Sequence, residues 1–208
     1  MSKIFIIGLP RTGTTSVCVS LLDLGFKVAH CAVTEGSLMA ADVVGDTPAY
    51  CDYKILDQRF PQSRFIYLER NIDSWLPSIK VLFENMIGGL SAPQGGFPPA
   101  VKRCYAEIFN PITIESIKSD EHLSSCYTKH KNNVLQYFQD KPASFISIDI
   151  SQSSAYKDMI SFLGVNSKRD SFRKMNTKGQ IVSWRELQHK NKIQLNLPGS
   201  NGKRELYL

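Results

Sequence analysis

The sequence lacks several features that would define its class at once. Its 208 residues contain no apolar run close to the ~20 residues that a membrane-spanning helix needs. The five cysteines are odd in number, scattered and without a C-x-x-C pair, which indicates reduced thiols rather than a disulfide framework. The four histidines show no metal-ligand spacing, so no metal is expected.

Signals for a leader sequence and for nucleic-acid binding are also missing. The first apolar run, residues 4–7, is interrupted by Gly8 and Pro10 and is too short for the core of a signal peptide. There is no zinc finger, aromatic RNA-binding motif or long basic helix. We therefore expect a cytoplasmic protein without a membrane or nucleic-acid partner. The formal net charge of +6 favours an anionic ligand instead.

Composition and length are those of an ordinary globular domain. Apolar residues make up 42% of the chain and charged residues 21%. We expect one domain over residues 1–208, which is a suitable length for a single α/β core. The glycines and prolines of residues 91–99 predict a lid or acceptor-side insertion around 88–125. Weak patterning predicts a loose C-terminal segment from about residue 167.

The most informative segment is residues 8–16, which read Gly-Leu-Pro-Arg-Thr-Gly-Thr-Thr-Ser. A short apolar run precedes it, and an amphipathic stretch follows it from Val17 to Leu24 and stops at Gly25. A strand, a glycine turn and a helix in this order aim backbone N–H groups and a helix N-terminus at an anion. The segment therefore predicts a phosphate-binding loop.

This loop departs from the nucleotide P-loop pattern at one position. Both glycines and Thr15 match G-x-x-x-x-G-K-[ST], whereas Thr14 stands in place of the lysine. Kinases and ATPases use that lysine on the β- and γ-phosphates, so its absence argues against phosphoryl transfer. Here Arg11 supplies the cation. A P-loop nucleotide kinase or NTPase, with Asp149 as the metal ligand, is the alternative.

A second segment suits a second phosphate. Residues 64–69 have the pattern of a buried strand, and Arg70 follows directly. Ser78 lies one to two turns into the next expected helix. Open α/β sheets bind ligands at the carboxyl ends of their strands, so a basic residue at this point is well placed to bind an anion.

Together the two segments resemble those of the sulfotransferases that use 3′-phosphoadenosine-5′-phosphosulfate (PAPS) as sulfuryl donor. Residues 10–15 match that family's loop P-[KR]-[ST]-G-T-[ST], and Arg70 with Ser78 matches its second motif at the same spacing. The strand expected at 145–150 and the helix end Phe162-Leu163-Gly164 are similar to later parts of the family.

The resemblance implies roles for individual residues. Arg70 and Ser78 would bind the 3′-phosphate, and Arg11 would stabilise charge on the phosphate–sulfate bridge. Backbone and hydroxyl donors for the 5′-phosphate would come from Thr12, Gly13, Thr14, Thr15 and Ser16, and Pro10 and Arg11 would complete the cofactor-binding loop. A basic C-terminal loop would close over the nucleotide, although a solvated face explains the same residues, which are Lys168, Arg169, Arg173, Lys174, Lys178, Lys203 and Arg204.

A general base is needed near the sulfur, and three residues after the second expected strand are candidates. Glu35 has the loop-to-base distance closest to glutamate-using relatives, so it ranks first. Asp46 ranks second because it also suits a helix cap, and His30 third because it also suits a structural histidine.

Alternating strands and helices predict a three-layer α/β/α P-loop domain with a mostly parallel central sheet. We expect strands at residues 3–7, 26–30, 64–69 and 145–150. We expect helices at 14–24, at 34–44, from 46 or 47 to 60, and from about 73 to Gly88-Gly89 with Pro77 in the first turn. We also expect one or two helices over 114–139 and a helix that ends at Gly164.

The function implied by the resemblance is transfer of a sulfuryl group from PAPS to a hydroxyl or amine of a small-molecule or glycan acceptor. Besides the kinase or NTPase, a non-catalytic nucleotide-binding protein on the same fold is a second alternative. The acceptor and the oligomeric state are not indicated by the sequence.

Overall fold

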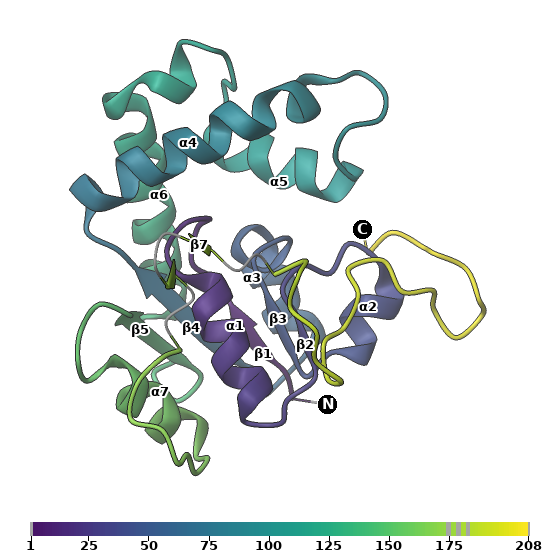
Figure 1. Ribbon diagram of the computed structural model, residues 1–208, viewed down its shortest axis with the longest axis vertical. Coiled ribbons are helices and arrows are strands. Elements are labelled where there is room, and N and C mark those ends of the chain that lie inside the picture. The colour runs from purple at the N-terminus through teal and green to yellow at the C-terminus, as the bar shows by residue number, and fades with distance from the viewer. Residues whose placement is uncertain (1, 174–175, 178–179, 182–183, 208) are drawn as a thin grey trace.

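Five parallel strands form the central sheet, in the order β2-β3-β1-β4-β5 (Figure 1). The computed structural model describes residues 2–173, 176–177, 180–181 and 184–207. The strands of the sheet are β1 (Ile4–Ile6), β2 (Val28–Ala29), β3 (Val43–Gly45), β4 (Arg64–Glu69) and β5 (Phe145–Asp149). A separate antiparallel pair is formed by β6 (Asn176–Thr177) and β7 (Gln180–Ile181).

Helices cover both faces of the sheet, which confirms the α/β/α expectation. They are α1 (Thr14–Asp23), α2 (Glu35–Ala40), α3 (Ala49–Arg59), α4 (Ile72–Ser91), α5 (Pro99–Phe109), the 3₁₀ helix η1 (Ser116–Lys118), α6 (Asp120–Phe138) and α7 (Ala155–Leu163). Within the described part of the chain, no helix has both the length and the apolar character that crossing a bilayer requires.

Alternation along the strands determines the two faces. Ile66 and Leu68 of β4 pack with α1 and α7, whereas Phe65 and Tyr67 pack with α3 and the C-terminal part of α6. All four side chains are fully buried, because a parallel sheet covered on both faces leaves its central strands no contact with water.

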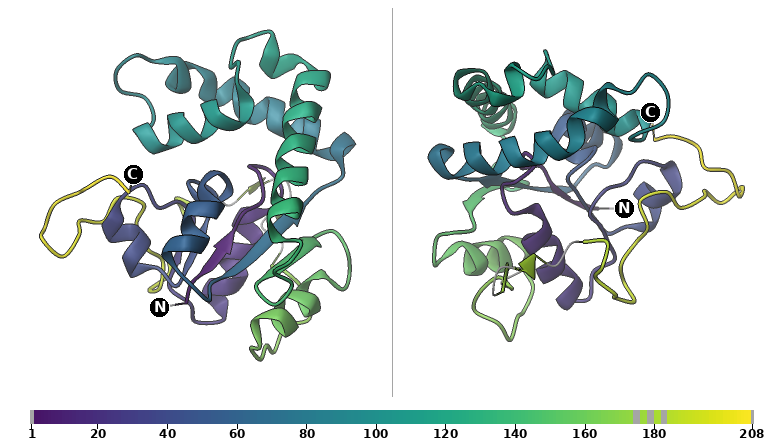
Figure 2. Two further views of the ribbon diagram at one scale, coloured as in Figure 1. Left: turned by 180° about the vertical axis from the view of Figure 1, so that it is seen from behind. Right: turned by 45° about the horizontal axis from the view of Figure 1, so that its top comes forward.

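A helical cap, made of α4, α5, η1 and the start of α6, stands over the carboxyl ends of the strands (Figures 1 and 2). Its own core is largely aromatic and includes Trp75, Phe83, Tyr105 and Phe109. Leu9, from the loop after β1, is also buried in this core. The expected insertion around 88–125 therefore contains the second half of this cap, and α5 is a helix that the sequence pattern did not predict.

The expectation of one helix over residues 34–44 is wrong. Helix α2 ends at Ala40, Ala41 is extended, and residues 43–45 form strand β3 next to β1. A three-residue strand buried on both faces shows no period-2 alternation, so its two valines look like a continuation of the helix.

The boundaries expected for α4 are also wrong. Asn71 caps the helix, with its Oδ1 accepting from the N–H groups of Asp73 (2.9 Å) and Ser74 (3.3 Å). Pro77 is therefore the sixth helical residue and lies beyond the first turn. The helix also continues through Gly88 and Gly89 to Ser91, because the apolar stripe that buries Trp75, Ile79 and Phe83 outweighs these local penalties.

The C-terminal segment, expected to be loose, is attached along the sheet edge over residues 191–197 and again at residues 205–207, while the loop between them extends outward (Figure 1). Ile193 N–H donates to the Val28 carbonyl (2.8 Å), and Val33 N–H donates to the Leu195 carbonyl (2.9 Å). Tyr207 is buried at only 4% exposure. Backbone pairing of this kind is tertiary, so no local pattern in the sequence signals it.

The adjacent glycines of α4 provide a matched test of this packing. Gly88→Ala places its methyl group in open space and should stabilise the fold by about 0.5–1 kcal/mol, the usual helix-propensity gain. Gly89→Ala places Cβ 2.7 Å from Phe97 Cε2 and should cancel or reverse that gain. Urea unfolding of both variants measures the difference, and equal stabilisation by both would contradict the contact with Phe97.

Candidate active site

One cavity of about 1240 Å³ lies between the carboxyl edge of the sheet and the helical cap. Four strands lead directly into it, because the residue that follows each strand lines the cavity. These residues are His30 after β2, Asp46 after β3, Arg70 after β4 and Ile150 after β5. The parallel direction of the strands therefore gathers the candidate residues at one place.

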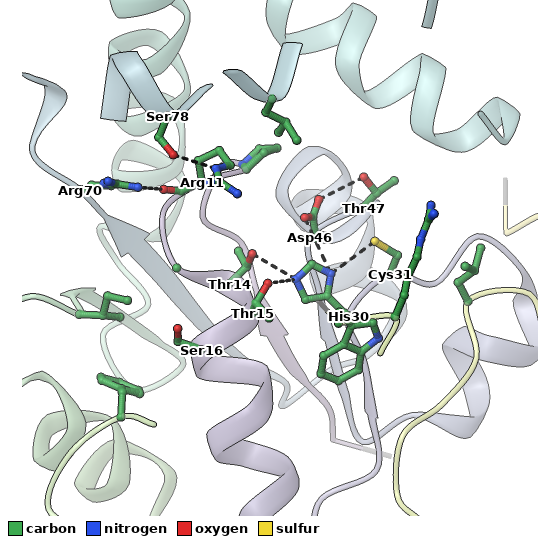
Figure 3. A pocket seen from close by; sticks show the side chains of 18 of the residues that line it. Arg11, Thr14, Thr15, Ser16, His30, Cys31, Asp46, Thr47, Arg70 and Ser78 are labelled. Atoms are coloured by element: carbon green, nitrogen blue, oxygen red, sulfur yellow. Dashed lines mark hydrogen bonds and ion pairs between the residues drawn. The ribbon is translucent and has the colours of Figure 1, made fainter. Parts of the chain in front are cut away.

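The loop from β1 to α1 forms an anion cradle on this cavity (Figure 3). Arg11 and Gly13 have positive φ angles of 72° and 103°, which turn the chain sharply before the helix. No side chain caps α1, so its first-turn N–H groups remain available to an anion. Gly13, Thr14, Thr15 and Ser16 all line the cavity, as expected from the sequence.

Three hydrogen bonds fix the carbonyl groups of this loop. The buried indole of Trp75 donates to the Pro10 carbonyl at 2.9 Å. Arg70 donates through a terminal nitrogen to the Arg11 carbonyl at 2.7 Å, and Thr12 Oγ1 donates to the Leu9 carbonyl at 2.7 Å. Because two of the donors come from the end of β4 and from α4, both phosphate motifs form one connected unit.

Thr12 does not present its hydroxyl group to the cavity, contrary to expectation. It is 1% exposed, does not line the cavity and uses its hydroxyl on the Leu9 carbonyl. The direction of this side chain follows from the packing of the loop against β4, where Gly8 allows an approach that a Cβ would block at 2.6 Å from Leu68 Cβ.

Arg11, Arg70 and Ser78 come together on the cap side of the cradle (Figure 3). Arg11 Nε donates to Ser78 Oγ at 2.8 Å, and Arg70 Nε donates to Ser74 Oγ at 3.2 Å. Among the residues that the structure describes, neither guanidinium forms an ion pair with a carboxylate. Partial burial, and then the charge of Arg11, lower the pKa of Arg70, so an anion bound here would relieve this repulsion.

His30 faces the cradle from the other side (Figure 3). Its Nε2 lies 3.0 Å from Thr15 Oγ1 and 3.3 Å from Thr14 Oγ1, while Nδ1 lies 3.9 Å from Asp46 Oδ2. The ring of Trp184 packs on the imidazole, with centroids 5.3 Å apart. Burial lowers the pKa of His30 although Asp46 opposes the shift, so the imidazole is neutral near pH 7.

Thr47 and Cys31 lie beside Asp46 and His30. Thr47 Oγ1 donates to Asp46 Oδ1 at 3.3 Å, and the Cys31 thiol lies 3.7 Å from His30 Nδ1. Burial raises the pKa of Asp46, and its effect exceeds the opposing influence of His30 and Thr47. Cys31, Tyr105 and Trp184 line the cavity but were not singled out in the sequence, because a lone thiol and core-like aromatic residues carry no pattern.

Glu35, ranked first among the candidate bases, lies outside the cavity. It opens α2, and its carboxylate pairs with Arg59, the last residue of α3. Distance along the sequence does not indicate this position, because residues 31–34 lead the chain from the end of β2 to the start of α2, where the Glu35 N–H donates to the Glu205 carbonyl at 3.0 Å. The order of preference is therefore changed, since His30 and Asp46 line the cavity and Glu35 does not.

A family model described as a sulfotransferase domain matches residues 3–38 and 32–181. The chain belongs to this sulfotransferase family. A comparison with curated proteins gave no match. The matched residues include the cradle, His30, Asp46, Arg70 and Ser78, so the family assignment covers most of the cavity lining but not residues 184–185 and 192–196.

The C-terminal part contributes three cations to the cavity, of which one was expected from the sequence. Arg173 lines it as expected, together with Arg185 and Lys192. The ammonium of Lys192 is already held by three backbone carbonyls, the closest being that of Trp184 at 2.6 Å. Four of the other basic residues expected to close over the nucleotide do not line the cavity, namely Lys168, Arg169, Lys203 and Arg204. The other two, Lys174 and Lys178, lie outside the described residues.

The hydrogen bond from the Thr12 hydroxyl to the Leu9 carbonyl can be tested for its contribution to stability. Thr12→Val keeps the side-chain shape but loses the bond to Leu9, and should cost about 0.5–1.5 kcal/mol of unfolding free energy. Thr12→Ser keeps the hydroxyl and should remain closer to the parent protein in urea unfolding. If both variants lost the same stability, the hydrogen bond would not be the cause.

Proposed function

We propose that the protein transfers a sulfuryl group from PAPS to a hydroxyl or amine of a small-molecule acceptor. One observation carries the proposal: two anion sites, the cradle at α1 and the Arg70–Ser78 pair, share one cavity and are joined by Arg11. A nucleotide with phosphate groups at both ends of its ribose matches two such sites. Family membership supports sulfuryl transfer, and the double site supports this donor.

The residues of the cavity fit the donor at each end. The uncapped N-terminus of α1 and the hydroxyls of Thr14 and Thr15 would hold the 5′-phosphosulfate. Arg70 and Ser78 would hold the 3′-phosphate, supplying charge-assisted hydrogen bonds. A cavity of about 1240 Å³ leaves space for an acceptor besides a nucleotide, since single-ligand pockets range from about 300 to 1,000 Å³.

His30 is the proposed general base and Asp46 its positioning residue. His30 Nε2 faces the cradle, where the sulfur would lie, and the neutral imidazole is able to accept a proton. Asp46 on the Nδ1 side favours the tautomer with its proton on Nδ1 and stabilises the imidazolium that forms.

Each step of the transfer has a residue to serve it. His30 Nε2 accepts the acceptor's hydroxyl or amine proton as the acceptor atom bonds to sulfur. The bond between sulfur and the bridging oxygen breaks, and Arg11 stabilises the negative charge that grows on the departing phosphate. Positioning and charge stabilisation supply most of the rate enhancement, as in phosphoryl transfer.

The side chains on the cap-side wall of the cavity indicate which kind of acceptor fits. It is lined by Leu82, Met86, Phe97, Val101 and Tyr105. These apolar and aromatic side chains favour a small molecule with an apolar body over a glycan, whose many hydroxyls would lose their hydrogen bonds to water here.

The two alternatives have less support. A P-loop kinase needs the lysine that Thr14 replaces, and the Asp149 carboxylate accepts from the Ser151 N–H (2.9 Å) and does not line the cavity. A non-catalytic nucleotide-binding protein does not require a histidine and a carboxylate side by side at the cradle.

Nucleotide choice tests the double anion site. Adenosine 3′,5′-bisphosphate should bind more tightly than AMP or ADP in calorimetry without metal, and ATP with magnesium should not outcompete it. Arg70→Met should remove about 1.5–3 kcal/mol of that preference, roughly 10- to 150-fold in affinity. Lys80→Met is the control, because Lys80 of α4 pairs with Asp120 and does not line the cavity. Equal affinity for all nucleotides would contradict the assignment.

The base assignment is tested by three substitutions in parallel. His30→Ala should lower turnover by at least ~100-fold while bisphosphate binding persists, the usual scale for losing a general base. Asp46→Asn should also lower turnover, through the orientation of His30. Glu35→Gln should keep near-normal turnover, because Glu35 lies outside the cavity. Loss of activity in Glu35→Gln alone would restore the ranking based on the sequence.

A further inference from the structure

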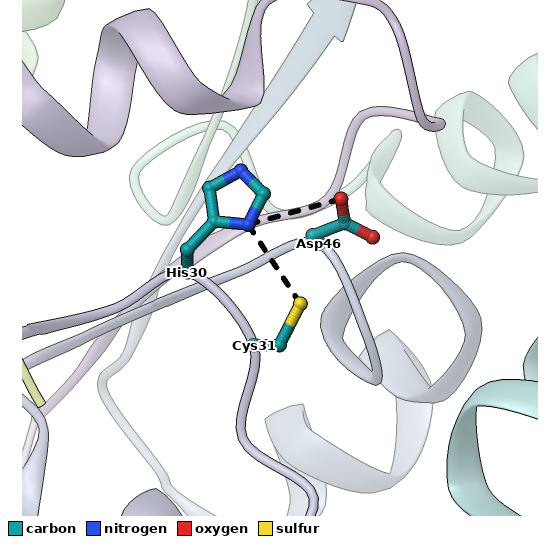
Figure 4. A group of neighbouring side chains, drawn as sticks. All are labelled: His30, Cys31 and Asp46. Atoms are coloured by element: carbon teal, nitrogen blue, oxygen red, sulfur yellow. Dashed lines mark hydrogen bonds and ion pairs between the residues drawn. The ribbon is translucent and has the colours of Figure 1, made fainter. Parts of the chain in front are cut away.

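Three metal-binding side chains converge beside the cradle: His30, Cys31 and Asp46 (Figure 4). One potential ligand atom from each lies within 4.8 Å of the other two. Nδ1 of His30 is 3.7 Å from the Cys31 sulfur and 3.9 Å from Asp46 Oδ2. The chain bends after β2, so that His30 and Cys31 both point toward the end of β3 although they are adjacent in sequence.

These separations are close to those of a tetrahedral zinc site. Zinc bonds of about 2.0–2.3 Å at tetrahedral angles separate the ligand atoms by about 3.3–3.6 Å. The observed distances of 3.7 and 3.9 Å exceed this range by about 0.1–0.6 Å, and the Asp46 ligand oxygen lies within 4.8 Å of the Cys31 sulfur, so small side-chain rotations would close the site. The cavity lies next to the group, which leaves room for water as the fourth ligand.

Neighbouring hydroxyls support ligation by these atoms. Thr15 Oγ1 is 3.0 Å from His30 Nε2 and can accept a hydrogen bond from a protonated Nε2, which leaves the Nδ1 lone pair free for a metal. Thr47 donates to Asp46 Oδ1 and leaves Oδ2 facing His30. Ligating histidines and carboxylates in proteins usually have such outer hydrogen-bond partners.

The combination of nitrogen, sulfur and oxygen ligands indicates which metal ion would bind. Imidazole, thiolate and carboxylate together suit Zn²⁺, whereas Mg²⁺ and Ca²⁺ take oxygen ligands. A second group, Cys51, Asp52 and Glu107, has similar spacing but a different environment. There the Arg103 guanidinium contacts both carboxylates, at 2.5 Å from Asp52 and 3.4 Å from Glu107, and already supplies the positive charge.

We propose that His30 Nδ1, the Cys31 thiolate and Asp46 form an inhibitory Zn²⁺ site with water as the fourth ligand. Binding releases the thiol proton of Cys31 to solvent. The inhibition, unlike the binding, rests on the proposed function. Zinc on Nδ1 requires the proton on Nε2, the reverse of the tautomer that general-base catalysis uses, and it also occupies Asp46. The metal therefore removes the base without blocking the anion cradle.

Metal binding is tested first on the purified full-length protein, without nucleotide or acceptor. Calorimetry with Zn²⁺ should show one site, and Co²⁺ should give a thiolate-to-cobalt absorption band in the near ultraviolet. Cys31→Ser should lower Zn²⁺ affinity by at least about 100-fold and abolish the band, with folding checked by circular dichroism. Cys51→Ser is the matched control and should change neither. The reverse pattern, or binding unaffected by both variants, would overturn the site.

The inhibitory role is tested separately. Zn²⁺ should suppress sulfuryl transfer at the concentrations that fill the site, while adenosine 3′,5′-bisphosphate still binds to the zinc-loaded protein. Turnover by Cys51→Ser should remain zinc-sensitive, and residual turnover by Cys31→Ser should resist zinc. Acceleration by Zn²⁺, or equal sensitivity of both variants, would overturn the inhibition. If no sulfuryl transfer is found at all, the calorimetric and cobalt results still decide the metal site.

Discussion

The parallel direction of the five strands is the constraint on which the site depends. Each strand runs from the far edge of the sheet toward the cap, so each crossover returns the chain to start again at the same side. In the register of the sheet, Ile6 of β1 pairs with Gly45 of β3 and with Ile66 of β4. The loops after β1 and β3 therefore begin near each other, whereas β4 continues to Glu69. The Arg70 side chain then connects the end of β4 to the β1 loop through the Arg11 carbonyl.

The anion cradle could be predicted from sequence because its information is local. A strand, a glycine-containing turn and a helix start lie within a short stretch, and the arginine at the end of β4 has the same kind of context. The direction of Thr12 could not be predicted, since it depends on contact with Leu9 and on the approach of Gly8 to β4. Local patterns identify the loop, but tertiary packing determines which of its hydroxyls face the ligand.

The first rank of Glu35 among the candidate bases has a related cause. Strand β3 is short and buried on both faces, so it was hidden in an expected helix over residues 34–44. Without β3, nothing in the sequence places His30 next to Asp46, and distance along the chain favours Glu35. Once β2 and β3 are recognised as neighbours, with Ala29 opposite Val44, the residues that follow each strand must meet. The error in one element therefore became an error in the ranking of the site.

The C-terminal segment has a consequence for solubility as well as for the cavity. Strand β2 is at an edge of the sheet, and unpaired edge strands invite pairing with other chains. Here Val28 donates to the Asn191 carbonyl (3.0 Å) and accepts from the Ile193 N–H, so the segment occupies the open side of β2. The same segment carries Trp184 against His30. Detachment of these residues would thus both remove the aromatic neighbour of His30 and leave a strand edge exposed to aggregation.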